Sequence, residues 1–187
     1  MPSIPDSFIV STVNFYAIQV RSRSELRYMK LFAGMNPSVS ELFDLHFPRR
    51  SLKVRRAGVT RQVEAAVFPG YLFVEAEAED LAAHRLLFRR TDGFFRFLKS
   101  NTDIRPLEGR NLELVLHFVR KAGPVAGISR VIFDENSRIV VKDGPLQGLE
   151  GRIVKVDRRK RRAKVKLDLY EDTFAVDLAF EILESGK

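Results

Sequence analysis

Hydrophobic and polar positions in the first two thirds of the chain predict strands that alternate with helices. Residues 13–20 (VNFYAIQV) are rich in aromatic and β-branched side chains, which is typical of a strand. Helical spacing runs from Leu26 to Phe32, and a glycine, an asparagine and a proline soon afterwards end this helix. Further helices are predicted at residues 79–90, where acids precede arginines as the helix dipole favours, and at residues 106–120.

The segment between the first two helices reads as extended. Residues 49–61 place Ala57 and Gly58 between two basic arms, which predicts a hairpin with its tip near Gly58. The run 67–74 (VFPGYLFV) is densely apolar and predicts a central, buried strand, with a kink at its Pro-Gly pair. With another strand at 94–98, the order β-α-β-β-α-β-α indicates an α+β sandwich with an antiparallel sheet.

The last third of the chain predicts a second, smaller domain. Residues 121–129 (KAGPVAGIS) have no periodicity and contain Gly and Pro, which is typical of a linker. Short strands then recur, and about five of them in some fifty residues indicate a small β-barrel. The strands are expected at 138–142, 149–157, 162–169, 173–178 and 181–183. The predicted division is therefore an N-terminal domain at 1–120, a linker at 121–133 and a barrel at 134–187.

Composition excludes several classes of chemistry. The 187 residues include no cysteine, so disulfides and thiolate metal sites are excluded. No stretch approaches the roughly 18 apolar residues of a membrane span, and the opening residues lack the basic leader of a secretory signal. His46, His84 and His117 are scattered, without paired carboxylates at ligand spacing. We therefore expect a cytoplasmic monomer without a membrane anchor, a metal, a cofactor or enzymatic activity.

Positive charge is concentrated in one segment. Residues 152–166 contain nine Lys and Arg residues and one acid, so the net charge of this segment equals the net charge of the whole chain, +8. Such a concentration predicts a surface that meets a polyanion, although a merely solvated turn is the alternative. Gly144, Gly148 and Gly151 precede it. They indicate sharp turns rather than a phosphate-binding loop, because no lysine-hydroxyl pair and no helix follow them.

Two motifs resemble the NusG family of transcription factors. VFPGYLFV at 67–74 is similar to the FPGY segment of that family, and IVVKDGPLQGLEGRIVKVD at 139–157 is similar to its KOW motif. The order of elements also resembles that family. The resemblance implies an NGN domain, a linker and a C-terminal KOW domain with an SH3-like barrel, and a role in transcription elongation or antitermination.

The resemblance also implies contacts with RNA polymerase. An aromatic patch of Tyr16, Phe68 and Tyr71, with Leu72 nearby, would dock the clamp helices of the polymerase, and His84 would approach the opposite wall of its cleft. Buried aromatic anchors commonly carry protein interfaces. The alternatives are that the rings are ordinary core residues and that His84 is a solvated helix residue.

The resemblance further implies that the predicted hairpin lies near upstream DNA, where its cations would bind phosphates without reading sequence. A solvated loop is the alternative interpretation. The cations concerned are Arg49, Arg50, Lys53, Arg55, Arg56 and Arg61.

The KOW segment is more basic than that of housekeeping family members, which resembles specialised paralogues of the RfaH and LoaP type. The resemblance implies that it binds nascent RNA, including a hairpin, since arginine forks onto phosphates and stacks on bases. The residues concerned are Lys155, Arg158, Arg159, Lys160, Arg161, Arg162 and Lys164.

The basic charge makes the usual partners of the KOW domain, Rho and a small-subunit ribosomal protein, less certain. Because this segment is rich in β-branched residues, we predict a stable barrel that does not refold into helices. A ribosome-associated RNA-binding protein that does not bind polymerase is the alternative function.

Overall fold

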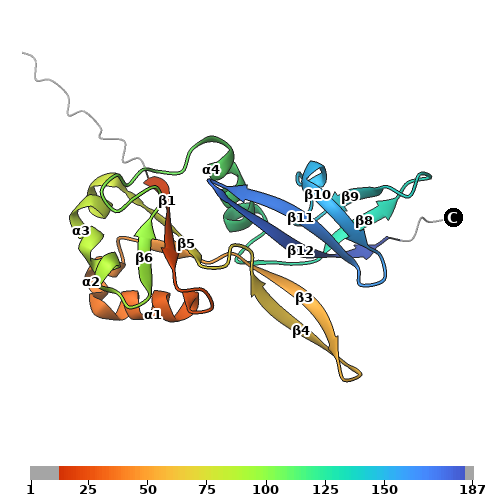
Figure 1. Cartoon of the computed structure of the whole chain (residues 1–187), viewed down its shortest axis with the longest axis horizontal. Coiled ribbons are helices and arrows are strands. Elements are labelled where there is room, and N and C mark those ends of the chain that lie inside the picture. The colour runs from red at the N-terminus through yellow and green to blue at the C-terminus, as the bar shows by residue number, and fades with distance from the viewer. Residues whose placement is uncertain (1–12, 184–187) are drawn as a thin grey trace, which may run out of the picture.

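The computed structural model describes residues 13–183, which form two domains joined by a helix (Figure 1). The N-terminal domain is built on a four-stranded sheet in the order β2-β5-β1-β6, in which every neighbouring pair is antiparallel. Its strands are β1 (Val13–Val20), β2 (Asp44–His46), β5 (Tyr71–Glu77) and β6 (Phe94–Phe97). Its helices are α1 (Glu25–Met35), α2 (Pro37–Ser40) and α3 (Ala78–Arg90).

Alternation along β1 and β5 gives this sheet two apolar faces. Ile18 and Leu72 point toward the helices, where they pack in one core with Phe32 of α1 and Phe88 of α3. Phe15, Ala17, Tyr71 and Phe73 belong to a second core on the opposite face. Because successive side chains of a strand point to opposite sides, a continuous apolar run such as 71–74 is what a sheet covered on both faces requires.

A β-hairpin extends from the edge of the molecule (Figure 1). It consists of β3 (Arg49–Arg56) and β4 (Val59–Ala66), joined by the two-residue turn Ala57-Gly58. Both turn residues have positive φ, at 48° and 79°, as the type I′ turn of a tight hairpin demands. The predicted hairpin and its tip are thus confirmed. The short strand β7 (Val125–Ala126) runs parallel to the start of β3.

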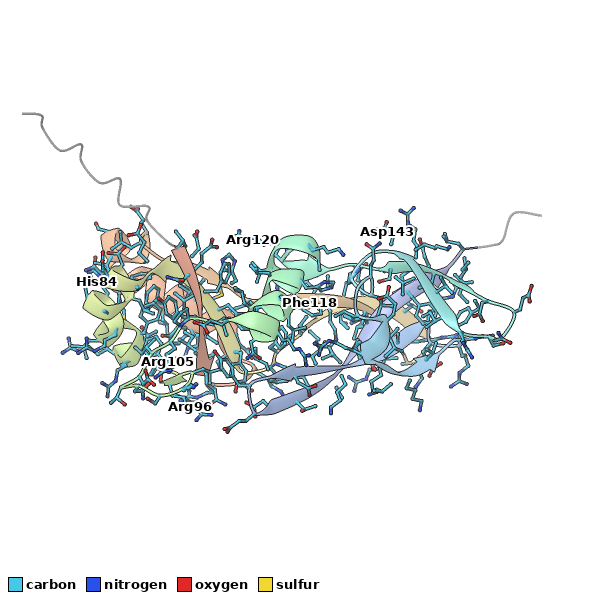
Figure 2. All side chains as sticks on the ribbon, turned by 90° about the horizontal axis from the view of Figure 1, so that it is seen from above. His84, Arg96, Arg105, Phe118, Arg120 and Asp143 are labelled. Carbon is cyan, nitrogen blue, oxygen red and sulfur yellow. The ribbon has the colours of Figure 1, made fainter. Side chains whose placement is uncertain are left out.

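A helical segment lies between the two domains. The α-helix α4 (Gly109–Leu116) continues into the π-helical turn η1 (His117–Lys121). Phe118 of η1 is completely buried, and Figure 2 shows it near the middle of the molecule, between the N-terminal sheet and the barrel. This segment corresponds to the helix predicted at 106–120.

The C-terminal domain is a five-stranded sheet in the order β10-β11-β12-β8-β9, curled into a small barrel. The 3-10 turn η2 (Glu150–Arg152) precedes β10. The strands are β8 (Ser129–Phe133), β9 (Ile139–Asp143), β10 (Ile153–Asp157), β11 (Arg162–Leu169) and β12 (Asp172–Ile182).

Two details of the barrel differ from the sequence-based expectation. Residues 129–133, which we placed in the linker, form β8, which pairs with β12 and β9 and buries Val131 completely. The glycines and proline just before this strand concealed its start. The two strands expected at 173–178 and 181–183 are one strand, β12, because its register with β11 continues without a break into the pairing with β8. Residues 184–187 of the predicted barrel lie outside the described residues.

A single hydrophobic core connects the two domains. It includes Phe68 and Tyr71 of the N-terminal domain, Phe118 of η1, and Leu146 and Val165 of the barrel. The barrel therefore packs on the sheet face that helices α1 to α3 leave open. No helix of the described residues is long and apolar enough to span a membrane.

Candidate protein and nucleic-acid interfaces

Phe68 and Tyr71, predicted to dock polymerase, lie under the barrel in this structure. They are only 1% and 2% exposed. The ring of Phe174 on β12 packs edge-on against both, with ring centres 5.5 Å from Phe68 and 5.7 Å from Tyr71. Phe118 packs edge-on against Phe68 from the side of η1. These rings thus form the contact between the two domains.

A polar contact accompanies the rings. The hydroxyl of Tyr71 donates a hydrogen bond to Oδ2 of Asp172. Burial, followed by this contact with a carboxylate, raises the pKa of Tyr71 to about 12. Nearby, the amide of Tyr170 donates to Oδ1 of Asn111 at 3.0 Å, and Nε2 of His117 lies 2.7 Å from the carbonyl oxygen of Pro145. The barrel is therefore held by polar contacts to the sheet, to α4 and to η1.

Tyr16 does not share a face with Phe68 and Tyr71. It belongs to the core on the helical side of the sheet and is 3% exposed. Burial raises its pKa above the ordinary tyrosine value. Since Tyr16 and Tyr71 point to opposite sides of the sheet, the structure does not bring the predicted patch together as one surface. Leu72 also lies on the helical side.

His84 lies on α3, far from the barrel (Figure 2). Its Nδ1 donates to the carbonyl oxygen of Asp80 at 3.0 Å, and its ring packs edge-on against Phe43 at 6.0 Å between centres. The side chain is partly exposed. Its neighbour Phe43 belongs to the core on the helical side of the sheet, whereas Tyr71 belongs to the core on the other face, so contacts at His84 and Tyr71 would be made on different sides of the domain.

The six cations of the hairpin divide into two groups. Arg49 pairs with Glu64 across the hairpin, and Arg50 donates to the carbonyl oxygen of Ala66. Burial lowers the pKa of Arg50, an effect that the carboxylate of Asp177 opposes. These two arginines are partly buried at the hairpin base. The remaining four are exposed, namely Lys53, Arg55, Arg56 and Arg61.

The predicted RNA-binding residues gather at one end of the barrel, on β10, β11 and the turn between them. Lys155, Arg158, Arg159, Lys160 and Arg161 are exposed, and Arg162 and Lys164 are partly buried. The cations of β11 alternate with Ala163, Val165 and Leu167, which are completely buried. One strand thus supplies both the core of the barrel and a basic outer face.

Three carboxylates temper this charge without neutralising it. Asp177 lies 3.4 Å from Lys164 and 4.0 Å from Arg162. Asp157 lies 4.0 Å from Lys160, and Asp168 lies 3.8 Å from Lys166. Within residues 13–183, no ion pair involves Lys155, Arg159 or Arg161. An open positive face therefore remains.

Arg158 differs from its neighbours because the protein itself uses part of its guanidinium. The group lies 3.8 Å from the ring centre of Phe133, where a cation–π contact is favourable. It also donates to the carbonyl oxygen of Ser137 at 2.9 Å. Arg158 thus fastens the β10–β11 turn to the neighbouring β8–β9 hairpin.

Two of the three glycines before the basic segment, Gly144 and Gly148, have the backbone of a sharp turn, whereas the expectation for Gly151 is wrong, because its φ is not positive and an added Cβ would meet nothing within 4 Å. Gly144 has φ of 95°, and a Cβ there would lie 2.6 Å from Cα of Ser129. The hydroxyl of Ser129 accepts from the amide of Leu146 at 2.9 Å, which holds the turn against β8. Gly148 also has positive φ. Only a residue without a side chain fits the close approach at Gly144, which favours a structural role over a phosphate-binding loop.

Sequence reasoning missed the contacts that join the domains. No sequence motif distinguishes the residues that make these contacts, Phe174, Asp172 and Asn111, from their neighbours, and a local pattern does not reveal an interdomain contact. Phe118, on the predicted helix 106–120, was the one sequence feature that could have indicated the interdomain contact. An amphipathic helix between two domains is expected to bury its apolar face against one or both of them.

These elements form a two-domain protein in which an aromatic sheet face contacts a basic barrel, with a basic hairpin beside it. Among the described residues, no group of three or more His, Asp or Glu side chains could hold a metal ion. Residues 13–116 match the family model described as transcription termination factor nusG. The chain belongs to the NusG family of transcription factors, and the predicted fold class, an NGN domain followed by a KOW domain, is confirmed.

Curated relatives agree with this family. The chain is 28% identical over 148 residues to the transcription termination/antitermination protein NusG of Vibrio cholerae, covering 78% of this chain and 80% of the relative. It is 26% identical over 150 residues to the NusG of Buchnera aphidicola, covering 79% and 81%. A solved structure of Thermotoga maritima NusG aligns over 90% of this chain and 94% of its own, with 16% identity and a TM-score of 0.49.

Proposed function

We propose that this protein is a transcription elongation and antitermination factor that binds RNA polymerase through its NGN domain and nascent RNA through its basic KOW barrel. The observation that carries the RNA half is the open positive face of the β10–β11 end, where Lys155, Arg159 and Arg161 are exposed and form no ion pair within residues 13–183. Family membership supports the transcription half.

Polymerase binding requires the barrel to leave the NGN sheet. Phe68 and Tyr71 are almost completely buried beneath Phe174 in the docked arrangement. A protein partner that uses these rings therefore competes with the barrel for one face. The docked and undocked forms are two states, and a partner shifts their populations only by binding one of them better.

The concentration of charge at one end of the barrel supports a specialised role of the kind that the RfaH and LoaP paralogues have. The C-terminal segment is built of strands in this structure, and that this barrel does not refold into helices stays a prediction. Rho and a small-subunit ribosomal protein remain candidate partners of the barrel. Lys53, Arg55, Arg56 and Arg61 are the hairpin residues available to phosphates of upstream DNA.

The RNA half is tested by replacing Arg159 and Arg161 with alanine in the full chain. The slope of log affinity against log salt is negative, and each lost phosphate contact should reduce its magnitude by roughly 0.7 to 0.9. Fluorescence anisotropy with a labelled RNA stem-loop measures this slope. Arg90→Ala/Arg110→Ala removes the same charge at exposed positions outside the barrel and serves as the control. Equal affinity and slope in both variants would reject RNA binding by the barrel.

The polymerase half is tested separately by retention of purified core RNA polymerase on the immobilised full chain. Retention supports an elongation factor. Sedimentation with ribosomes and no retention of polymerase would instead support a ribosome-associated RNA-binding protein.

A further inference from the structure

The basic hairpin and the basic end of the barrel lie side by side and form one groove. Its volume is about 610 Å³. Lys53, Arg55 and Thr60 line it from the hairpin, and Arg159, Lys160 and Arg162 line it from the barrel. The walls meet where Nη2 of Arg162 donates to the carbonyl oxygen of Lys53 at 2.5 Å. Five cations from two domains, about a hundred residues apart in sequence, therefore face one space.

We propose that this groove is a single binding site for the sugar-phosphate backbone of an RNA stem, with one wall from the NGN domain and the other from the KOW barrel. The proposal deepens the proposed RNA binding and rests on it. It assigns to the hairpin, in the docked form, a role in holding RNA. The docked form thereby differs from the undocked form, in which the hairpin is free to meet DNA.

The lining indicates backbone recognition. No aromatic side chain lines the groove, whereas proteins that bind single strands usually stack bases on aromatic rings. Guanidinium and ammonium groups bind phosphates, and an arginine fork suits two phosphate oxygens at once. Without rings to hold unpaired bases, the groove fits one strand of a paired stem, whose bases face away from it.

The hydroxyl of Thr60 would make the groove selective for RNA over DNA. Thr60 is the neutral polar side chain among the lining residues. A hydroxyl both donates and accepts, and so can pair with the 2′-hydroxyl of a ribose. Cations bind phosphates of either nucleic acid, whereas a contact between Thr60 and a 2′-hydroxyl requires a ribose and would therefore favour RNA.

The groove exists only while the domains are docked. The contacts of Phe174 with Phe68 and Tyr71 hold the barrel on the sheet, and they lie outside the groove lining. Undocking would move Arg159 and Lys160 away from the hairpin without removing any cation. RNA in the groove should therefore stabilise the docked form, and by linkage oppose a partner that needs the rings of the sheet.

The decisive variant is Lys53→Ala/Arg55→Ala in the full chain, measured with the labelled RNA stem-loop. Both side chains are exposed, and circular dichroism should be unchanged. We expect the affinity to be about tenfold lower and the magnitude of the slope of log affinity against log salt to fall by roughly 1.5, as the loss of two phosphate contacts requires. The Arg90→Ala/Arg110→Ala control should stay within about twofold. An RNA affinity equal to that of the control would show that the hairpin takes no part and would overturn the proposal.

A second variant tests whether docking creates the site. Phe174→Ala removes no charge, and we expect it to weaken binding of the same stem-loop about fivefold, because undocking separates the walls. Unchanged affinity in a variant shown to be undocked would overturn the composite site. If Arg159→Ala/Arg161→Ala also has no effect, then the proposed RNA binding fails as a whole; if only the hairpin and Phe174 variants lack an effect, the groove alone fails.

Competition with a DNA duplex of the same sequence assigns the ligand. The stem-loop RNA should resist displacement by the duplex, and Thr60→Val should reduce the preference for RNA about threefold. Displacement by an equal or lower concentration of DNA would overturn the assignment to RNA.

Discussion

The hydroxyl of Tyr71 on the central sheet donates a hydrogen bond to Asp172 at the start of the last strand of the barrel. The two residues come from different domains, and the contact turns a ring of the FPGY segment away from solvent. Burial and the carboxylate together raise the pKa of Tyr71 to about 12, so this hydroxyl is protonated and able to donate at neutral pH. The docked barrel thus has a specific polar contact as well as an apolar one.

Truncation of Phe174 should loosen the docking. Phe174→Ala removes two edge-to-face contacts, each worth about 0.5–1.5 kcal/mol beyond the area that it buries. We expect the undocked population to rise and retention of core RNA polymerase to increase several-fold. Amide chemical shifts of β5 and β12 would report the undocking.

The control for this variant is Phe95→Ala. Phe95 is 56% exposed on β6, so its truncation removes the same ring without opening the interface. If Phe174→Ala undocks the barrel and polymerase retention still matches that of Phe95→Ala, the barrel does not mask a polymerase-binding face.

Acid should weaken the contact between η1 and the barrel. Burial lowers the pKa of His117 below its ordinary value of 6.5, because removing the charged ring from water is unfavourable, although the hydrogen bond to the carbonyl oxygen of Pro145 opposes the shift. A depressed pKa means that the stabilisation is present above about 6.5 and is lost as pH falls through the lowered value. Thermal unfolding measured from about pH 7.5 to about pH 5 should therefore show falling stability, by an amount that depends on the folded-state pKa.

A His117→Gln variant should show a smaller loss of stability over the same range, because glutamine does not titrate and its amide can still donate to the carbonyl of Pro145. His84→Gln, at a partly exposed position on α3, is the matched control. Equal pH profiles for wild type and His117→Gln would exclude His117 as the titrating group.

A buried carboxylate holds the FPGY turn. Glu25 is 4% exposed, and its Oε1 accepts from the amide of Gly70 at 2.7 Å. Glu25→Ala leaves that buried amide without its partner, which should reduce the free energy of unfolding by about 2 kcal/mol. Denaturant unfolding measures the effect. Glu79→Ala, at an exposed position in the first turn of α3, should cost less than about 1 kcal/mol; similar losses would contradict the role of Glu25.

Two glycines of the KOW motif should respond differently to alanine. Gly144→Ala brings a Cβ to 2.6 Å from Cα of Ser129 at a positive φ, so we expect destabilisation of about 2 kcal/mol or more. A Cβ added at Gly151 would project into open space with nothing within 4 Å, and φ there is not positive, so Gly151→Ala should be tolerated. Thermal unfolding of both variants tests the comparison, and equal melting temperatures would contradict it.

Most local elements of the fold could be predicted from the sequence because their signals are local. The hairpin tip at Ala57-Gly58 follows from the two basic, extended arms around it, and β1 follows from its aromatic and β-branched residues. The start of β8 could not be found, because the Gly- and Pro-containing segment before it has no periodicity and the strand is defined by its partners β9 and β12.

The candidate interfaces were less predictable, since they depend on which residues meet across long separations. The aromatic content of the 67–74 segment indicated an anchor, but the sequence did not show that Phe174 covers it or that Tyr16 points the other way. From the sequence alone, Arg49, Arg50 and Lys53 were equally good candidates for binding phosphates. Only the structure shows that the first two are used at the hairpin base, while Lys53 faces the barrel groove.

The alternation along β11 separates two kinds of constraint. Inward positions such as Val165 and Leu167 are constrained by packing in the barrel core. Arg162, Lys164 and Lys166 project from the outer side, where a binding partner, rather than the core, determines which side chains are suitable. A lineage can therefore exchange every second residue of this strand, and with it the choice of target, while the architecture that presents those residues persists.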